Sequence, residues 1–378
     1  MSKQLRIWLF VLLGTLFTSS SLLAEGIITM TTSKRVGEEI QLIIKANGNV
    51  TIEGAQETGQ ANESGFKPYR LTSQTITIRG DLTELDCFNN QLTSLDVSKS
   101  AALEVLFCSD NKLTSLDVSK NTALTELNCY SNQLISLDIS KNIALKGLYC
   151  GENQLTSLDV SKNTALTILD CFSSKLTNLD VSKNVALTEL NCYDNQLTSL
   201  DLSQNTALTK LDCSWNQLTS LDVSKNTALT SLSCFDNQLT SLNVSKNRAL
   251  TTLSCGGNQL TSLDVSKNTA LTELNCPDNQ LTSLDVSKNT ALESLECSIN
   301  QLTSLNISGC ARLEDLYCFS NCINGEAMTK LVNSLPNRKG MSSGSLWVVS
   351  RSSKKSDKNR CSAADVTTAK KKNWEVQQ

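Results

Sequence analysis

The sequence predicts an α/β repeat in which strands dominate: a solenoid with a parallel sheet on its concave side, a β-rich N-terminal cap and a small α/β C-terminal cap. Two observations carry the prediction. Twelve cysteines follow one another at a spacing of 21 residues, from Cys87 to Cys318, with no insertion or deletion. They stand in the pattern L-x-x-L-x-C-x-x-N-x-L, from which only Ser174 and Ile323 depart, and most units continue as T-S-L-D-V-S-K-N-T-A. A fixed period of this kind is typical of a solenoid.

The first 24 residues are typical of an export signal. Lys3 and Arg6 form a basic start, an apolar run extends from Ile7 to Phe17, and a small residue, Ala24, precedes Glu25. We predict removal of residues 1–24 and a mature protein outside the cytoplasm. After this start, no stretch approaches the roughly 20 apolar residues that span a bilayer.

Residues 25–81 are predicted to form the N-terminal cap. The segments 27–34, 39–46, 49–55 and 74–80 alternate apolar and polar residues and are separated by glycines, as short strands are. An uncovered solenoid end would expose unpaired backbone and apolar core, so a β-rich cap is expected there.

Residues 82–323 are predicted to form an array of twelve units, each with one short parallel strand. Alternation along the strand directs Leu127 and Cys129 inward, and Glu126 and Tyr130 outward. Cysteine behaves as a small apolar group, so it suits a narrow coil in which leucine would overfill the interior. Asn132 is expected to point inward and to bond the backbone of its turn and of the adjacent coils.

Two chemical interpretations of the cysteine ladder are less favoured than packing. Equivalent positions on parallel strands project their Cβ atoms side by side, which is poor geometry for a disulfide. A parallel column does not surround a tetrahedral zinc ion, and the chain has no histidine to complete a site. Off the ladder stand Cys310, Cys322 and Cys361, among which one structural disulfide is expected, with the pair left open.

Residues 324–378 are predicted to form the C-terminal cap. The segment 324–338 has a helical pattern that ends near Pro336, segment 344–350 has a strand pattern, and 362–374 has a helical pattern with Ser362 as N-cap. Ten basic residues lie between Arg338 and Lys372, but no stacking aromatics alternate with them. A solvated surface is therefore expected, and no nucleic-acid partner.

Composition argues against catalysis. Without Lys3 and Arg6 the chain has 32 basic and 37 acidic side chains, a balance too mild to select a partner. Histidine is absent, which removes the commonest general base and metal ligand. Since no Gly-rich phosphate loop is present either, we predict a protein that is not an enzyme and has no cofactor.

The positions that vary between units predict the binding site. The convex half of the unit hardly changes, whereas positions in and just after the strand differ and hold every aromatic residue of the array. Acidic residues such as Glu84, Glu126, Asp170, Glu189 and Asp212 surround them. Exposed rings within a charged surround are typical of a protein or glycan contact surface, although aromatics also simply favour strands. The predicted partner-binding residues are Phe88, Phe107, Tyr130, Tyr149, Phe172, Tyr193, Trp215, Phe235, Tyr317 and Phe319.

Two further columns bear on metal binding and on local stability. Aspartates such as Asp96 and Asp117 recur beside lysines such as Lys99, and we interpret this column as a solvated convex edge, not as a calcium site. Ser174 replaces the inward asparagine of its unit. A locally weaker turn is expected there.

The units resemble the 21-residue leucine-rich repeats of internalin J-like bacterial surface proteins, in which cysteine replaces a core leucine. The shared pattern within one unit consists of Leu187, Leu190, Cys192, Asn195 and Leu197, and the resemblance covers residues 82–323. The caps look like those of leucine-rich repeat proteins from Bacteroidetes-type bacteria. The resemblance implies a leucine-rich repeat solenoid in a secreted or cell-surface protein that binds macromolecules, often in host adhesion.

The predicted function is therefore that of an exported protein that binds a protein or glycan through its concave sheet, in adhesion or in host or cell-surface interaction. One alternative is a structural envelope component without a specific ligand, and a hydrolytic enzyme is less favoured. Periplasmic retention remains an open alternative for localisation. The sequence sets no oligomeric state.

Overall fold

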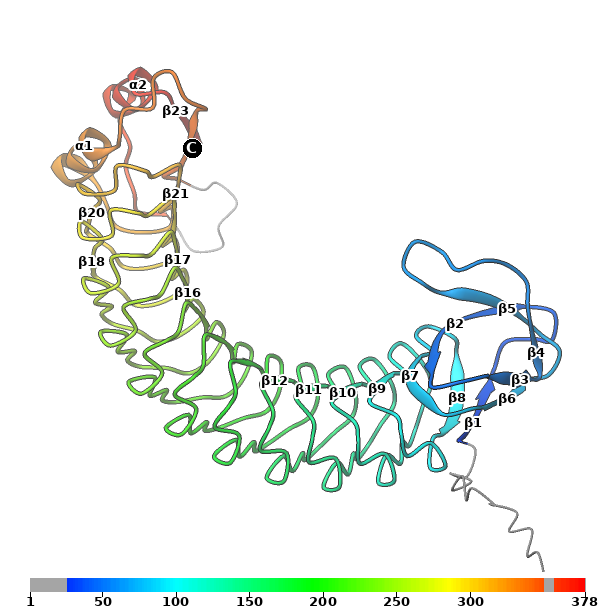
Figure 1. Cartoon of the computed structure of the whole chain (residues 1–378). Coiled ribbons are helices and arrows are strands. Elements are labelled where there is room, and N and C mark those ends of the chain that lie inside the picture. The colour runs from blue at the N-terminus through cyan, green and yellow to red at the C-terminus, as the bar shows by residue number, and fades with distance from the viewer. Residues whose placement is uncertain (1–25, 350–356, 378) are drawn as a thin grey trace, which may run out of the picture.

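The computed structural model describes residues 26–349 and 357–377, and the predicted signal, residues 1–24, lies outside them. Figure 1 shows an open arc, with the N-terminal cap at one end, the C-terminal cap at the other and the repeat strands along the inner side. The predicted fold, a leucine-rich repeat solenoid with a parallel concave sheet, is confirmed. None of the helices in the described part is long and apolar enough to cross a membrane.

One short strand from each unit forms the concave sheet. Neighbouring strands pair in parallel with an offset of 21 residues, so that Leu127 faces Leu106 on one side and Leu148 on the other. The strands are β7 (Leu82–Asp86), β9 (Val105–Phe107), β10 (Glu126–Asn128), β11 (Gly147–Tyr149), β12 (Ile168–Asp170), β13 (Glu189–Asn191), β14 (Lys210–Asp212), β15 (Ser231–Ser233), β16 (Thr252–Ser254), β17 (Glu273–Asn275), β19 (Ser294–Glu296) and β21 (Asp315–Tyr317).

Leucine and cysteine side chains fill the interior of each coil. Leu127 and Cys129 are completely buried, as are the other eleven ladder cysteines. The packing interpretation of the ladder is confirmed in this respect. Burial raises the pKa of the Cys129 thiol to about 12, so the thiol is protonated at neutral pH.

The inward asparagines connect successive coils, as predicted for Asn132. Its Nδ2 donates to the backbone oxygens of Cys108 (3.0 Å) and Cys129 (3.1 Å), and its Oδ1 accepts from the backbone N–H of Leu113 (2.9 Å). A buried turn has no water to satisfy its backbone, so these bonds are needed. They repeat along the array.

A second asparagine ladder stabilises the convex side and was missed in the sequence. Nδ2 of Asn121 donates to the backbone oxygens of Val97 (2.9 Å) and Ser100 (2.8 Å), and Asn142 repeats the pattern one coil later. The signal was present as the constant asparagine of S-K-N, although no strand pattern identified it as buried. Ser100 and Cys310 take its position in the first and the eleventh of the twelve units.

The N-terminal cap covers the first unit with two antiparallel layers. β2 pairs with β7 of the concave sheet, and β1 pairs with β8 (Leu92–Asp96) on the convex side. The cap strands are β1 (Ile27–Thr32), β2 (Glu39–Ala46), β3 (Thr51–Glu53), β4 (Ala55–Glu57), β5 (Lys67–Leu71) and β6 (Thr75–Arg79).

The segment predicted as one strand over 49–55 is two strands. Gly54, at φ 86°, separates β3 from β4, and a Cβ there would lie 2.1 Å from the backbone oxygen of Thr75. Only glycine permits this close approach. β5 was not predicted.

The C-terminal cap extends the concave sheet by two strands. β22 (Gly344–Trp347) pairs in parallel with β21, and β23 (Trp374–Gln377) pairs in parallel with β22. The predicted helices are α1 (Gly325–Ser334) and α2 (Ala363–Lys371). Ser362 is the N-cap of α2, as predicted, and forms a capping box with Asp365. The strand β23 was missed.

Asn359 continues the asparagine ladder from a distant part of the chain. Its Nδ2 donates to the backbone oxygens of Cys318 (2.8 Å) and Val348 (2.7 Å), and its Oδ1 accepts from the backbone N–H of Ile323 (2.7 Å). The cap therefore supplies the same bonds that a further unit would supply. Because Asn359 lies outside the period, the sequence pattern did not identify it.

The disulfide expected near the C-terminal cap is not formed. Cys310 is a buried free thiol whose Sγ donates to the backbone oxygen of Val286 (3.3 Å), and Cys322 is a half-buried free thiol. With these two unbonded, no pair among Cys310, Cys322 and Cys361 is left to form the bond. Cys310 instead occupies the last position of the convex asparagine ladder.

Candidate functional site

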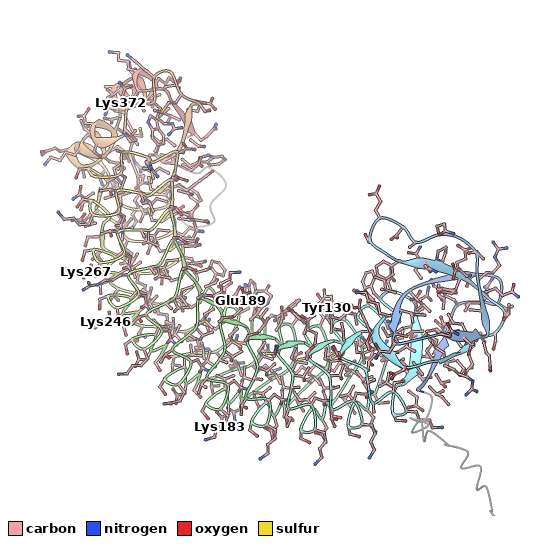
Figure 2. All side chains as sticks on the ribbon, viewed as in Figure 1. Tyr130, Lys183, Glu189, Lys246, Lys267 and Lys372 are labelled. Carbon is pink, nitrogen blue, oxygen red and sulfur yellow. The ribbon has the colours of Figure 1, made fainter. Side chains whose placement is uncertain are left out.

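Four positions in each unit form the concave face: the first and third residues of the strand and the two residues after the cysteine. In one unit these are Glu126, Asn128, Tyr130 and Ser131. The middle strand residue, Leu127, and the cysteine are buried instead. Figure 2 shows Tyr130 and Glu189 on the inner side of the arc.

The structure places all ten predicted binding residues on this face, in three columns. Phe107, Tyr149 and Tyr317 end their strands, and Trp215 stands second after its cysteine. Phe88 is 41% exposed and Trp215 52% exposed, while the other eight are half-buried. The residues directly after a cysteine are Phe88, Tyr130, Phe172, Tyr193, Phe235 and Phe319.

Three of the rings form a cluster in the N-terminal half of the array. The ring centroids of Tyr130 and Phe172 are 5.5 Å apart, and those of Phe172 and Tyr193 are 6.4 Å apart. Tyr130 and Phe172 come from units that are not adjacent. Gly151 stands between them, and a Cβ at that position would lie 2.7 Å from the Phe172 ring. The missing side chain therefore allows the two rings to meet.

The other rings do not continue this cluster as one row. The Phe235 ring lies over Gly256, where an added Cβ would be 2.7 Å from it. At the C-terminal end, Tyr317 pairs with Trp347 at a centroid distance of 6.0 Å. Trp347 is 39% exposed and was missed, because it belongs to the cap strand β22, whose pairing with β21 the sequence did not predict.

A shallow depression of about 320 Å³ lies beside the ring cluster, over β11 to β15. Tyr149, Asp170, Glu189 and Asp212 line it. Lys210 forms an ion pair with Glu189, at 2.8 Å from Nζ to Oε1. Burial raises the pKa of Asp170, and the nearby Asp212 adds to the effect. This part of the face therefore holds aromatic side chains next to carboxylates, and few basic side chains balance the negative charge of those carboxylates.

A second depression, of about 400 Å³, lies where the N-terminal cap meets the first unit. Phe88, Phe66, Lys34 and Glu39 contribute to its lining. The cap thus adds side chains to the concave face that the repeat pattern alone does not predict.

The second residue after each cysteine has a left-handed backbone. The twelve φ values lie between 45° and 60°. Asn, Asp, Ser and Gly dominate this column, as expected, since they tolerate this conformation. Glu152 (φ 46°), Trp215 (φ 52°) and Ile299 (φ 54°) are the exceptions, and the left-handed backbone disfavours the last two most because their side chains are bulky or β-branched.

The convex aspartates cap turns. The backbone N–H of Ser98 donates to Oδ1 of Asp96 (2.9 Å), and the same bond recurs in the following units. Asn243 accepts the equivalent bond from Ser245 (3.0 Å), so the position does not require a charge. Within residues 26–349 and 357–377, no cluster of three metal-ligating side chains is present.

Comparison with known proteins gives structural relatives. No protein-family model and no curated protein matches the chain. The functional domain of InlJ from Listeria monocytogenes, which includes a cysteine ladder, is 31% identical; the match covers 74% of this chain and 77% of that domain, with a TM-score of 0.51.

Two further solved structures show the same fold at lower identity. An internalin, InlF, from Listeria monocytogenes is 20% identical, covers 78% of this chain and 86% of its own, and has a TM-score of 0.69. The plant peptide hormone receptor RGFR1, solved in complex with RGF2, is 19% identical, covers 74% of this chain and 52% of its own, and has a TM-score of 0.57.

Proposed function

We propose that this chain, which belongs to the leucine-rich repeat family in its cysteine-ladder form, is a non-catalytic protein that binds another protein or a glycan through its concave face. One observation carries the proposal. Every aromatic residue of the array lies at one of the four concave positions, whereas the convex half of the unit keeps nearly the same sequence. Packing constrains both halves, so variation limited to one exposed face favours a role in recognition.

Trp215 supports the same proposal. A bulky side chain at positive φ costs conformational energy, and half of this ring is exposed to solvent. Folding alone would favour Asn, Asp or Gly at that position. A contact between the Trp215 side chain and a partner would explain why a tryptophan occupies this position.

Export and a role in adhesion or in host or cell-surface interaction belong to this proposal. Residues 1–24 have the composition of an export signal, and the similarity to InlJ and InlF is with internalins. The relation of the caps to those of Bacteroidetes-type proteins is also part of the proposal. A non-catalytic role is supported by the absence of histidine from the sequence.

The test is capture of surface components by the purified chain. Immobilised protein is incubated with extracellular-matrix and bacterial-surface extracts, and the retained components are identified by mass spectrometry. A variant with Tyr130→Ala, Phe172→Ala and Tyr193→Ala should lose them, because the three rings form one cluster. Loss of large interface rings typically costs more than about 2 kcal/mol of binding free energy at a hot spot.

A matched control truncates three exposed apolar residues elsewhere. Ile135, Ile143 and Val185 lie outside the concave positions and are 66%, 63% and 55% exposed. Their alanine variant should retain the same components, and both variants should keep the Tm of the parent. Equal retention by the ring variant and the parent would contradict the proposal and favour a structural role without a specific ligand.

A further inference from the structure

The concave face carries a strong excess of negative charge. Across the four concave positions of all twelve units, Lys210 is the single basic residue. The chain as a whole has a formal charge of only −3. The acidic side chains are therefore concentrated on the concave face, and the rest of the molecule has a net positive charge. The fourteen concave carboxylates are Glu84, Asp86, Asp110, Glu126, Glu152, Asp170, Glu189, Asp194, Asp212, Asp236, Glu273, Asp278, Glu296 and Asp315.

The convex edge has a different charge pattern. Its aspartate column and its lysine column each contribute nine residues to the array, so their charges balance. Figure 2 shows Lys183, Lys246 and Lys267 on the outer side of the arc, away from Glu189 and Tyr130. The acidic excess is limited to the face that also holds the rings.

The charges act on the ring cluster directly. The Tyr130 hydroxyl bonds Glu152, and this bond, burial and the charges of Glu152, Asp110 and Asp170 together raise the pKa of Tyr130 to about 12. Asp194 lies one unit further along, and its carboxylate accepts a hydrogen bond from the Ser173 hydroxyl (2.9 Å). The rings therefore lie in a negative potential.

The fold does not need the carboxylates at the last position of the strand to be charged. Asp170 accepts the backbone N–H of Phe172 (3.4 Å), and Asn128 accepts the equivalent bond from Tyr130 (3.1 Å) two units earlier. Asparagine thus performs the structural role in the same column. The turn therefore does not require the negative charge of this column.

We infer that the ligand of the concave face is a protein segment rich in arginine and lysine, whose cationic groups lie over the rings of Tyr130, Phe172 and Tyr193 and against the surrounding carboxylates. Guanidinium groups stack on aromatic faces and bond carboxylates in pairs, so this combination of side chains fits them. Successive strands lie about 4.8 Å apart, so an extended segment along the arc would meet a carboxylate in nearly every unit. The same charge disfavours acidic glycans. The inference rests on the proposed function and specifies its ligand.

The test uses a fluorescent twelve-residue peptide of four Arg-Gly-Ser triplets, with four Glu-Gly-Ser triplets as the charge-reversed probe. Affinity is measured by anisotropy at 50 and 300 mM salt. The arginine peptide should bind the parent chain, more weakly at high salt because screening shortens the range of the charges. The concave variant carries Glu126→Gln, Glu152→Gln, Asp170→Asn, Glu189→Gln and Asp194→Asn.

The control variant removes the same number of charges from the opposite face. It carries Asp138→Asn, Asp159→Asn, Asp180→Asn, Asp201→Asn and Asp222→Asn, which the natural Asn243 shows to be compatible with the turn. The concave variant should bind the arginine peptide at least about tenfold more weakly, and the control within about twofold of the parent, because carboxylates close to the bound arginines are lost only in the former. Equal weakening in both variants would indicate general attraction to an acidic protein and would overturn the inference.

Two other results would also overturn it: unchanged affinity of the concave variant, or equal binding of the glutamate peptide. These outcomes are separable from failure of the proposed function. If the ring variant loses its captured surface components while the arginine peptide shows no preference for the concave face, the face binds a ligand of another chemistry. If no captured component depends on the rings, the proposed function itself fails.

Discussion

Ser174 shows how much a single residue contributes to the turn of one unit. In the preceding unit, Asn153 donates to the backbone oxygens of Cys129 and Cys150 and accepts from the backbone N–H of Leu134. Ser174 is too short to make these bonds, and its buried hydroxyl has no partner among the described residues. The corresponding bond to the N–H of Leu155 is likewise not formed in the described part of the chain.

Replacing Ser174 by asparagine should therefore stabilise the protein. The new amide would donate to the backbone oxygens of Cys150 and Cys171 and accept from the N–H of Leu155, by analogy with Asn153. We expect a gain of about 1–3 kcal/mol, since each net hydrogen bond contributes roughly 1 kcal/mol. Urea unfolding measures it, and hydrogen exchange at Leu155 should slow.

The reverse substitution is the control. Asn153→Ser should cost a similar amount and speed exchange at Leu134, whose N–H then loses its acceptor. If Ser174→Asn leaves both stability and exchange unchanged, the asparagine ladder contributes less than the geometry indicates.

The ladder cysteines make a second prediction at this scale. All twelve are completely buried, whereas Cys322 is half-buried. Burial raises the thiol pKa values, so little reactive thiolate forms in the native protein. Titration with a thiol reagent before and after denaturation should reveal at least twelve additional thiols on unfolding. Substantially fewer would mean that ladder cysteines are exposed or bonded.

At the scale of the element, a carboxylate accepts the hydrogen bonds of the convex turn in most units. Hydrogen bonds from the serine two residues later, through its backbone N–H and hydroxyl, lower the pKa of Asp117, Asp138 and Asp159. A group whose pKa is lower in the folded state stabilises that state above its unfolded pKa of about 3.9. This contribution is lost as pH falls through the folded pKa.

The protein should therefore lose thermal stability below about pH 4. A variant with Asp138→Asn, Asp159→Asn and Asp180→Asn should show a smaller fall in Tm between pH 5 and pH 2.5, because asparagine accepts the bond at any pH, as Asn243 does. Thermal unfolding followed by circular dichroism measures both proteins. An identical fall would assign the acid sensitivity to other groups.

Three buried or half-buried carboxyls of the concave face have the opposite dependence. Burial raises the pKa of Asp86, Asp170 and Glu296, so their contribution to stability is present below the unfolded pKa and lost as pH rises through the folded value. Two faces of the same unit thus respond to acid in opposite directions. Repetition fixes the backbone of the unit and leaves its surface chemistry free to differ.

At the scale of the whole molecule, the arc separates two surfaces with different roles. On the convex side the same turn recurs in each unit, and the aspartates and lysines are equal in number. The aromatic rings of the array and the excess of carboxylates lie on the concave side (Figure 2). Such a large continuous face suits an extended macromolecular ligand better than a small molecule, since the rings and the carboxylates are spread over many units and are not gathered in one enclosed pocket.

Localisation decides where that ligand should be sought. We expect the protein to be accessible on the cell surface or released, because residues 1–24 have the composition of an export signal. Cell fractionation with protease treatment of intact cells measures this. A periplasmic protein would contradict the adhesin proposal and redirect the search to envelope partners, and a periplasmic marker protected from protease is the control.

Much of the fold follows from the sequence because a repeat is a local rule applied many times. The 21-residue period, the inward Leu127 and Cys129, the Asn132 bonds and the helix that starts after Ser362 each follow from residues close together in the chain. Alternation and spacing suffice to place them. The domain boundaries at residues 24, 81 and 323 stay predictions.

The sequence by itself determined that the ten rings would share one face, and only the tertiary structure decided which of them meet. Tyr130 reaches Phe172 because Gly151 leaves space in the unit between them, and Trp347 joins Tyr317 because the cap adds a strand to the sheet. Asn359 makes the hydrogen bonds that a further unit would make, although it lies 36 residues after Ile323, whose backbone N–H donates to it. These contacts depend on side-chain volume and on pairing between distant segments, which no local period encodes.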